Sequence, residues 1–158
     1  MAVIIKERII KNFVMNLLDD FELILINDFS VDASWKNIKI LSNNHNYIIG
    51  INLAENFGQH NALMAGLNHA KGDYIITMDA DLQDDPAEIP NLIDKLNDGW
   101  DLVSGWKKVR NDPLSKTLPS KIFNLVTRIL TGVKIHDFNC GLKGYKKVVI
   151  KSLDIYGG

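Results

Sequence analysis

The stretch Asp73-Tyr74-Ile75-Ile76-Thr77-Met78 runs directly into Asp79-Ala80-Asp81-Leu82-Gln83-Asp84-Asp85-Pro86. A short apolar run that ends in turn residues predicts a buried β-strand, here at 73–78. The acidic turn leads into a helix start, because Asp85 fits an N-cap, a proline follows it, and Glu88 fits the capping box. A buried strand that passes through a polar turn into a helix is typical of α/β proteins.

The same alternation of strand and helix extends in both directions along the chain. Further strands are predicted at 22–26, 47–53 and 101–104, and helices at 9–18, 59–70, 86–98 and 114–131. The strands are apolar without polar alternation, which indicates a sheet that helices cover on both faces. We therefore expect a single α/β domain over 1–158 with a mainly parallel sheet.

Acidic residues crowd the turn that follows the strand at 73–78. Like charges this close are unfavourable unless water or a cation screens them. Mg²⁺ in proteins is commonly held by one or two carboxylates together with substrate phosphates. Asp79 and Asp81 therefore predict a metal site, with solvated loop acids as the alternative. Asp84 and Asp85 are interpreted as helix-start acids, which the positive end of the helix dipole stabilises.

A second acidic turn, Asn27-Asp28-Phe29-Ser30-Val31-Asp32, follows the strand at 22–26. In open α/β sheets, ligands bind beyond the carboxyl ends of the strands. The carboxylate of Asp28 could accept hydrogen bonds from a base or a ribose, which predicts a nucleotide contact. The alternative is an Asx-turn or a helix cap, and that interpretation suits Asp32.

Charge is distributed unevenly along the chain, although its net value is −1. Residues 1–105 carry 7 Lys and Arg against 16 Asp and Glu, whereas residues 106–158 carry 11 against 3. Such a split indicates that the basic half meets an anionic partner, unless it is a solvated face. Nucleic acid is not indicated, because no aromatic motif interleaves the basic residues. Neither a G-x-G-x-x-G pattern nor a P-loop is present.

Hydropathy and cysteine content bear on the cellular setting. No apolar run approaches the roughly 20 residues that a membrane-spanning helix requires. Cys140 is the only cysteine, which excludes an intrachain disulfide and fits a reducing, cytoplasmic environment.

Four segments of the chain carry a resemblance to a known family. They are the run Leu25 to Ser34, Asn56-Phe57-Gly58-Gln59-His60, the acidic run 79–86, and the run His136 to Tyr145. The first resembles the Asp-Asp-Gly-Ser-x-Asp segment of family 2 glycosyltransferases with the GT-A fold. The other three are similar to the subgroup that acts on polyprenyl phosphates, such as dolichyl- and undecaprenyl-phosphate glycosyltransferases. The likeness covers about residues 20–158 and implies a Rossmann-like GT-A domain.

The resemblance implies a role for each matching residue. Asp79 and Asp81 would be the catalytic residues, and together with Gln83 they would hold Mg²⁺ or Mn²⁺ and the donor diphosphate. Asp28 would contact the nucleotide base. The basic residues that match positions near the acceptor phosphate are Lys107, Lys121 and Lys143. Members of the family often have Arg at the first two of these positions, and Lys binds phosphate as a point charge rather than as a bidentate fork.

The resemblance also implies the reaction: a metal-dependent, inverting transfer, of hexosyltransferase type, from a UDP- or GDP-linked sugar to a polyprenyl phosphate. The product would serve cell-envelope polysaccharide or glycolipid synthesis. An acceptor phosphate is already ionised near neutral pH, so no strong general base is required. The basic half would face the lipid phosphate, and peripheral contact at the cytoplasmic face of the membrane is expected. The helix expected at 114–131 either lies on that surface or packs in the core.

The chain also departs from the family pattern. The Pro-x-Tyr-Asn-Glu-like turn of the family's first strand has little counterpart before residue 22, and relatives continue beyond Gly158. We therefore expect a partial GT-A domain with a shortened first strand and without its C-terminal part. An incomplete sheet could favour a homo-oligomer or strand exchange. Phe29 stands where the family usually has Gly.

Three alternatives remain open from the sequence. One is a family 2 glycosyltransferase that acts on a hydroxyl acceptor. Another is a non-catalytic nucleotide-binding fragment. The third is a haloacid-dehalogenase-like phosphatase, in which Asp79 would be a nucleophile. Such phosphatases usually have Thr or Val where this chain has Gln83.

Overall fold

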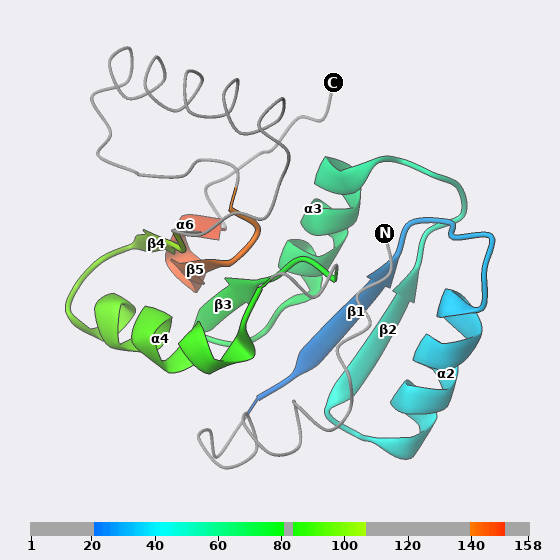
Figure 1. Ribbon diagram of the computed structural model, residues 1–158, viewed down its shortest axis with the longest axis horizontal. Coiled ribbons are helices and arrows are strands. Elements are labelled where there is room, and N and C mark those ends of the chain that lie inside the picture. The colour runs from blue at the N-terminus through cyan, green and yellow to red at the C-terminus, as the bar shows by residue number, and fades with distance from the viewer. Residues whose placement is uncertain (1–20, 81–83, 107–139, 151–158) are drawn as a thin grey trace.

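A computed structural model describes residues 21–80, 84–106 and 140–150 of the chain. Strands and helices alternate over much of this part, which confirms the predicted α/β class (Figure 1). The elements are β1 (Leu23–Asn27), α2 (Ser34–Asn44), β2 (Ile48–Asn52), α3 (Gln59–His69), β3 (Tyr74–Thr77), the 3₁₀ turn η2 (Pro86–Glu88), α4 (Ile89–Asn97), β4 (Leu102–Ser104), β5 (Lys143–Lys146) and α6 (Lys147–Ile150). The helices predicted at 9–18 and 114–131 lie outside the described residues.

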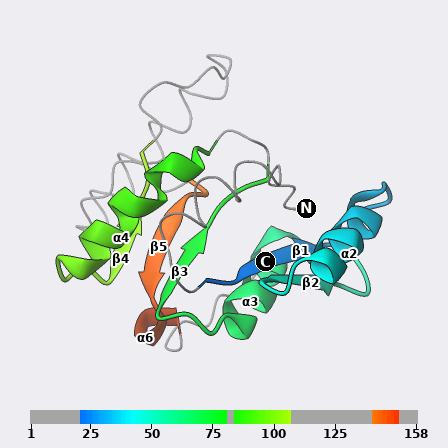
Figure 2. The ribbon, with the colours of Figure 1, turned by 90° about the horizontal axis from the view of Figure 1, so that it is seen from below.

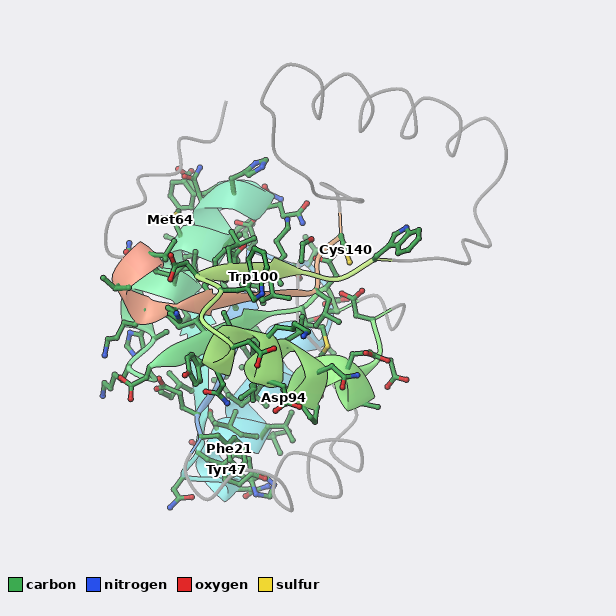
Figure 3. The ribbon with its side chains drawn as sticks, turned by 90° about the vertical axis from the view of Figure 1, so that its left-hand side faces the viewer. Phe21, Tyr47, Met64, Asp94, Trp100 and Cys140 are labelled. Carbon is green, nitrogen blue, oxygen red and sulfur yellow. The ribbon has the colours of Figure 1, made fainter. Side chains whose placement is uncertain are left out.

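The first sheet consists of β1 and β2, which run parallel in a register from Leu23 opposite Ile48 to Asn27 opposite Asn52. Helix α2 covers one face of this sheet, where Ile38 packs with the buried Leu25 and Ile48. The aromatic rings of Phe21 and Tyr47 meet before the amino ends of these strands, with centroids 5.0 Å apart (Figure 3). Both strands were predicted, but α2 was not.

The second sheet has the order β3-β5-β4, and β5 is antiparallel to both of its neighbours. Figure 2 shows β5 beside β3, with α4 along the outer side of this sheet. The sequence did not predict β5, because its residues Lys-Gly-Tyr-Lys show no apolar run. Gly144 suits the position, since a Cβ there would lie 3.1 Å from Ile76 and 3.2 Å from Leu96, tighter than most packed contacts.

Helix α3 connects the two sheets on one face. Gly66 lets the helix approach β1 closely, because a Cβ there would overlap the end of the Ile26 side chain. One turn of the same helix carries Leu67, which packs with Ile75 of β3 and Tyr145 of β5. Leu25 and Ile26 are adjacent, so they point to opposite faces of β1 and place α2 and α3 on opposite sides. Helix α4 packs on the other face of the second sheet through Leu92.

Glu22 fastens the far end of α3 to the start of β1. Its Oε1 accepts the backbone N–H groups of Lys71, at 2.5 Å, and Gly72, at 3.2 Å, in the loop that follows α3. The amino end of β1 and the carboxyl end of α3 are thereby held together.

The predicted start of helix 86–98 is largely confirmed. Asp85 caps it by accepting the N–H of Ala87 at 2.9 Å, and the first turn is the 3₁₀ turn η2. The capping box is wrong, because the Glu88 carboxylate accepts from the Asn91 side chain at 2.8 Å instead of returning to Asp85. Gly99, at φ 107°, ends the helix as predicted. None of the helices over the described residues is long and apolar enough to cross a lipid bilayer.

Candidate functional site

The turn after β1 is anchored to the end of β2. Asn27 is buried, and its Nδ2 donates to Oδ1 of Asn52 at 2.7 Å. Its own Oδ1 accepts the N–H of Ser30 at 3.3 Å, which closes the turn. Asp32 forms the predicted Asx-turn by accepting the N–H of Ser34 at 2.9 Å. The backbone of this turn is therefore fixed by side chains on both sides.

Asp28 is buried, with 4% of its surface exposed, and both of its carboxylate oxygens serve the start of α3. Oδ1 accepts the N–H of Phe57 at 2.8 Å, and Oδ2 accepts the N–H of Gly58 at 3.0 Å. A carboxylate is favourable here because the amino end of a helix carries partial positive charge. Asp28 thus positions the turn before α3, and its predicted contact with a nucleotide stays a prediction.

Asp79 follows β3 and is half-buried, at the carboxyl end of the strand as predicted. Its backbone N–H donates to Oδ2 of Asp84 at 3.1 Å. Asp84 is buried and closes the turn from within, so its interpretation as a helix-start acid is wrong. Asp85 does have that role, as its contact with Ala87 shows. Spacing alone could not distinguish these adjacent acids, because both precede the same helix.

The segment that leads into β5 packs against the Asp79 turn. The Thr77 hydroxyl donates to the Gly141 carbonyl at 3.0 Å, and the Gly105 N–H donates to the Leu142 carbonyl at 2.8 Å. A Cβ on Gly141 would overlap the carboxylate of Asp79, so the side chain of Asp79 lies directly against the Gly141 backbone. The run 136–145 was singled out in the sequence, but no signal there identified Gly141 as a neighbour of Asp79.

Cys140 and Lys143 lie on either side of this contact. Cys140 is buried in one cluster with Leu142 and with Leu92 of α4, so the segment packs against α4. Lys143 is opposite Thr77 of β3 and Ser104 of β4 in the sheet register. The structure therefore brings Lys143 and Asp79 to the same end of the second sheet. The arrowheads of β1, β2 and β3 point to the same side of the molecule in the view of Figure 1.

Four of the predicted site residues, Asp81, Gln83, Lys107 and Lys121, lie outside the described residues. Among residues 21–80, 84–106 and 140–150, no three His, Cys, Asp or Glu side chains are grouped to hold a metal ion. Asp79, at the carboxyl end of β3, carries a carboxylate, which is the type of ligand that hard divalent cations prefer. The complete ligand set stays a prediction.

The sequence profile of Glycosyl transferase family 2 matches residues 6–154. Two relatives, from Shewanella sediminis and Proteus mirabilis, are named undecaprenyl-phosphate 4-deoxy-4-formamido-L-arabinose transferase. The first is 42% identical over 134 residues, which cover 84% of this chain and 40% of the relative. The second is 39% identical over 148 residues, which cover 93% and 45%. The chain thus spans less than half the length of these relatives.

Glucosyl-3-phosphoglycerate synthase from Mycobacterium tuberculosis, solved in complex with phosphoglyceric acid, has a similar fold. The TM-score is 0.63 with 20% sequence identity, over 87% of this chain and 49% of the synthase. A mycobacterial protein superposes with the same TM-score at 19% identity, over 89% of this chain and 48% of its own. At this identity the likeness supports the GT-A fold.

Proposed function

This chain belongs to glycosyl transferase family 2, and we propose from that premise that it transfers a sugar from a nucleotide-sugar to a polyprenyl phosphate. One structural observation supports the proposal most directly. Asp79, which suits the donor diphosphate, lies at the same end of the second sheet as Lys143, which suits an acceptor phosphate. The relatives of about 40% identity are named as undecaprenyl-phosphate transferases, which supports undecaprenyl phosphate as the acceptor.

The sugar we propose is a pentose derivative. The named relatives transfer 4-deoxy-4-formamido-L-arabinose, whereas the sequence motifs alone suggested a hexosyltransferase. The formamido group of such a sugar has an N–H that donates a hydrogen bond and a carbonyl oxygen that accepts one. A site built to bind this group rejects sugars that lack it. The nucleotide is UDP or GDP, and the chemistry of the site favours neither.

The donor side of the proposed site rests on the acidic turn after β3. Asp79, together with Asp81 and Gln83, would hold Mg²⁺ or Mn²⁺ and through it the diphosphate. The metal would neutralise charge on the departing nucleoside diphosphate. Asp84 and Gly141 have a supporting part, because one accepts the N–H of Asp79 and the other leaves room for its carboxylate. Glycosyl transferase family 2 enzymes commonly depend on a divalent metal.

On the acceptor side, positioning is the main task of the protein. A phosphate monoester has a second pKa of about 6, so one of its oxygens can attack the anomeric carbon as an anion. Lys143, at the sheet end, would orient that phosphate and offset its charge, with Lys107 and Lys121 as further contacts. Attack opposite the leaving diphosphate would invert the anomeric configuration. Because the acceptor is a lipid, we place the reaction at the cytoplasmic face of the membrane.

Nucleotide binding tests the donor side. Isothermal titration of the chain with UDP and GDP should show binding that requires Mn²⁺ and that is lost in Asp79→Asn. The matched control is Asp94→Asn, an exposed acid of α4, which should bind like the wild type. Absence of binding by either nucleotide, with or without Mn²⁺, would contradict the proposed donor site and also the nucleotide-binding alternative, and would favour an inert fragment.

Transfer itself is tested by mass spectrometry of the products. The chain is incubated with Mn²⁺, a panel of UDP- and GDP-linked sugars, and either undecaprenyl phosphate or undecaprenol. We expect product on the phosphate only, with reduced yield in Lys143→Ala. Product on the hydroxyl acceptor alone would support the other family 2 activity, and an aspartyl-phosphate trapped at Asp79 would support a phosphatase.

A further inference from the structure

Phe29 adopts an unusual backbone conformation. Its φ is 56°, and among the residues that the structure describes it is the only non-glycine residue with a positive φ. A bulky side chain in this left-handed region is a conformational outlier, since the Cβ crowds the following carbonyl. Asn or Gly would fit this position with less strain. A large aromatic residue here therefore needs an explanation.

Packing does not supply the explanation, because the ring lies at the surface. Phe29 is 55% exposed, so little of the ring is buried in a core. The strain is instead maintained by the neighbours. Asn27 holds the N–H of Ser30, and Asp28 is tied to the turn before α3. Strain that the surrounding structure imposes on an exposed side chain is a recurrent feature of ligand sites.

Exposed apolar side chains gather near this turn, next to exposed polar ones. Phe57 is 46% exposed and Val31 is 99% exposed, whereas the carboxylate of Asp28 between them is buried. Phe57 is close to Asp28 because its own N–H donates to that carboxylate. Beyond the carboxyl end of β1, the rings of Phe29 and Phe57 are therefore more exposed than the carboxylate of Asp28, which the sequence suggested as the nucleotide contact.

We propose that Phe29 stacks on the nucleobase of the donor and contributes to nucleotide affinity, an inference that rests on the proposed function. The carboxyl end of β1 is the part of an open α/β sheet where ligands bind. Every nucleobase offers a flat face to an aromatic ring, and the fixed turn holds the ring in place before the ligand arrives. Phe57 lies at the same edge and is available for a second contact.

The charge around the turn favours a base over a lipid surface. Asp32, in the same turn, and Glu55, two residues before Phe57, are both exposed. An anionic membrane surface would repel these two carboxylates, whereas it attracts Lys and Arg. A neutral aromatic base meets no such repulsion.

The test compares nucleotide with pyrophosphate binding in four proteins: wild type, Phe29→Asn, Phe29→Tyr and the control Val31→Ala. Affinities for UDP, GDP and pyrophosphate are measured by titration calorimetry with Mn²⁺, and Tm is measured for each protein. Loss of one base–ring contact should weaken nucleotide binding of Phe29→Asn by roughly 5- to 100-fold. Pyrophosphate affinity should not change, and Tm should equal or exceed that of the wild type, because Asn tolerates the left-handed region. Phe29→Tyr keeps a ring and should retain the affinity, as should Val31→Ala.

The outcomes separate this inference from the proposed function. Wild-type affinity for UDP and GDP in Phe29→Asn would overturn the stacking role alone. An equal loss for pyrophosphate, or a marked fall in Tm, would show that Phe29 supports the turn and does not contact the base. Weaker binding of Phe29→Asn to phosphatidylglycerol vesicles, with unchanged nucleotide affinity, would assign the ring to the membrane and overturn the inference. A wild-type chain that binds pyrophosphate with Mn²⁺ but no nucleotide would also overturn it, whereas one that binds neither would remove the proposed function as well.

Discussion

At the scale of single residues, the two acidic turns use their carboxylates differently from what their sequences suggest. Asp28 was predicted to contact a ligand, and Asp84 was predicted to lie at the start of a helix. Both side chains are buried and accept backbone N–H groups. A buried carboxylate with such partners stabilises a turn that would otherwise leave amide groups unsatisfied. Asp79 is more exposed than either of them, and its contact with a ligand stays a prediction.

The contribution of Asp84 can be measured by removing its acceptor oxygen. We expect Asp84→Ala to lower the free energy of unfolding by about 1–3 kcal/mol, because the N–H of the half-buried Asp79 loses its acceptor. Asp84→Asn keeps one oxygen and should lose less. Urea unfolding measures both, and Asp94→Ala on the exposed side of α4 is the control, with a change within about 0.5 kcal/mol. A loss in Asp84→Ala no larger than in the control would contradict the role of Asp84 in the turn.

At the scale of elements, the sequence was most informative where one apolar run formed one buried strand. Both ends of β1, β2 and β3 lie within one residue of their predicted bounds. The sequence did not predict α2, because its apolar residues Trp35, Ile38 and Leu41 are separated by polar residues that are typical of a loop. The sequence did not predict β5, because its partners β3 and β4 are far away along the chain. Pairing between distant strands produces no pattern in the local sequence.

Contact between α3 and β1 gives a test at this scale. Gly66→Ala gains about 1 kcal/mol of helix propensity but must displace the end of Ile26, and overpacking of this kind typically costs about 1–3 kcal/mol. We expect a net loss of stability in the wild-type background. In an Ile26→Val background the blocking methyl group is absent, so the same substitution should be neutral or stabilising. The two single variants and the double variant form a cycle, and urea unfolding should give a coupling of about 1 kcal/mol. Additive effects would mean that the helix does not approach β1 at Gly66.

At the scale of the whole molecule, family and fold could be recognised from motifs, but the assembly of the site could not. The approach of Gly141 to Asp79 joins residues more than sixty positions apart and depends on β5, which the sequence did not predict. The order of the motifs indicated the GT-A fold, which the solved structures support. The prediction of a single domain over 1–158 stays a prediction, as do the roles of Asp81, Gln83, Lys107 and Lys121.

Tyr145 links the second sheet to α3 and α6, through Leu67, Ile75 and Ile150. Burial raises the pKa of its phenol above the ordinary value, and the side chain of Thr77 opposes this shift in part. The unfolded chain therefore releases this proton first as pH rises. The stability associated with the neutral phenol is fully present below the unfolded pKa of about 10 and is lost as pH rises toward the folded pKa.

This linkage predicts an alkaline limit on stability. The free energy of unfolding should fall between about pH 9 and about pH 11, and the fall should be smaller in Tyr145→Phe, which has no phenolic proton. Urea unfolding at both pH values measures the difference, with Tyr74→Phe as the control at an exposed ring. An identical decline in Tyr145→Phe and the wild type would mean that other groups set the limit.

Glu22 and Asp28 lie at opposite ends of β1 and accept backbone N–H groups at opposite ends of α3. This strand and helix therefore share their end points as well as the contact at Gly66. In terms of local opening, neither element can fray from an end without breaking hydrogen bonds between a carboxylate beside β1 and backbone N–H groups beside α3, so the two should open together as one cooperative unit. Local opening near the carboxyl end of β1 should then begin outside this pair.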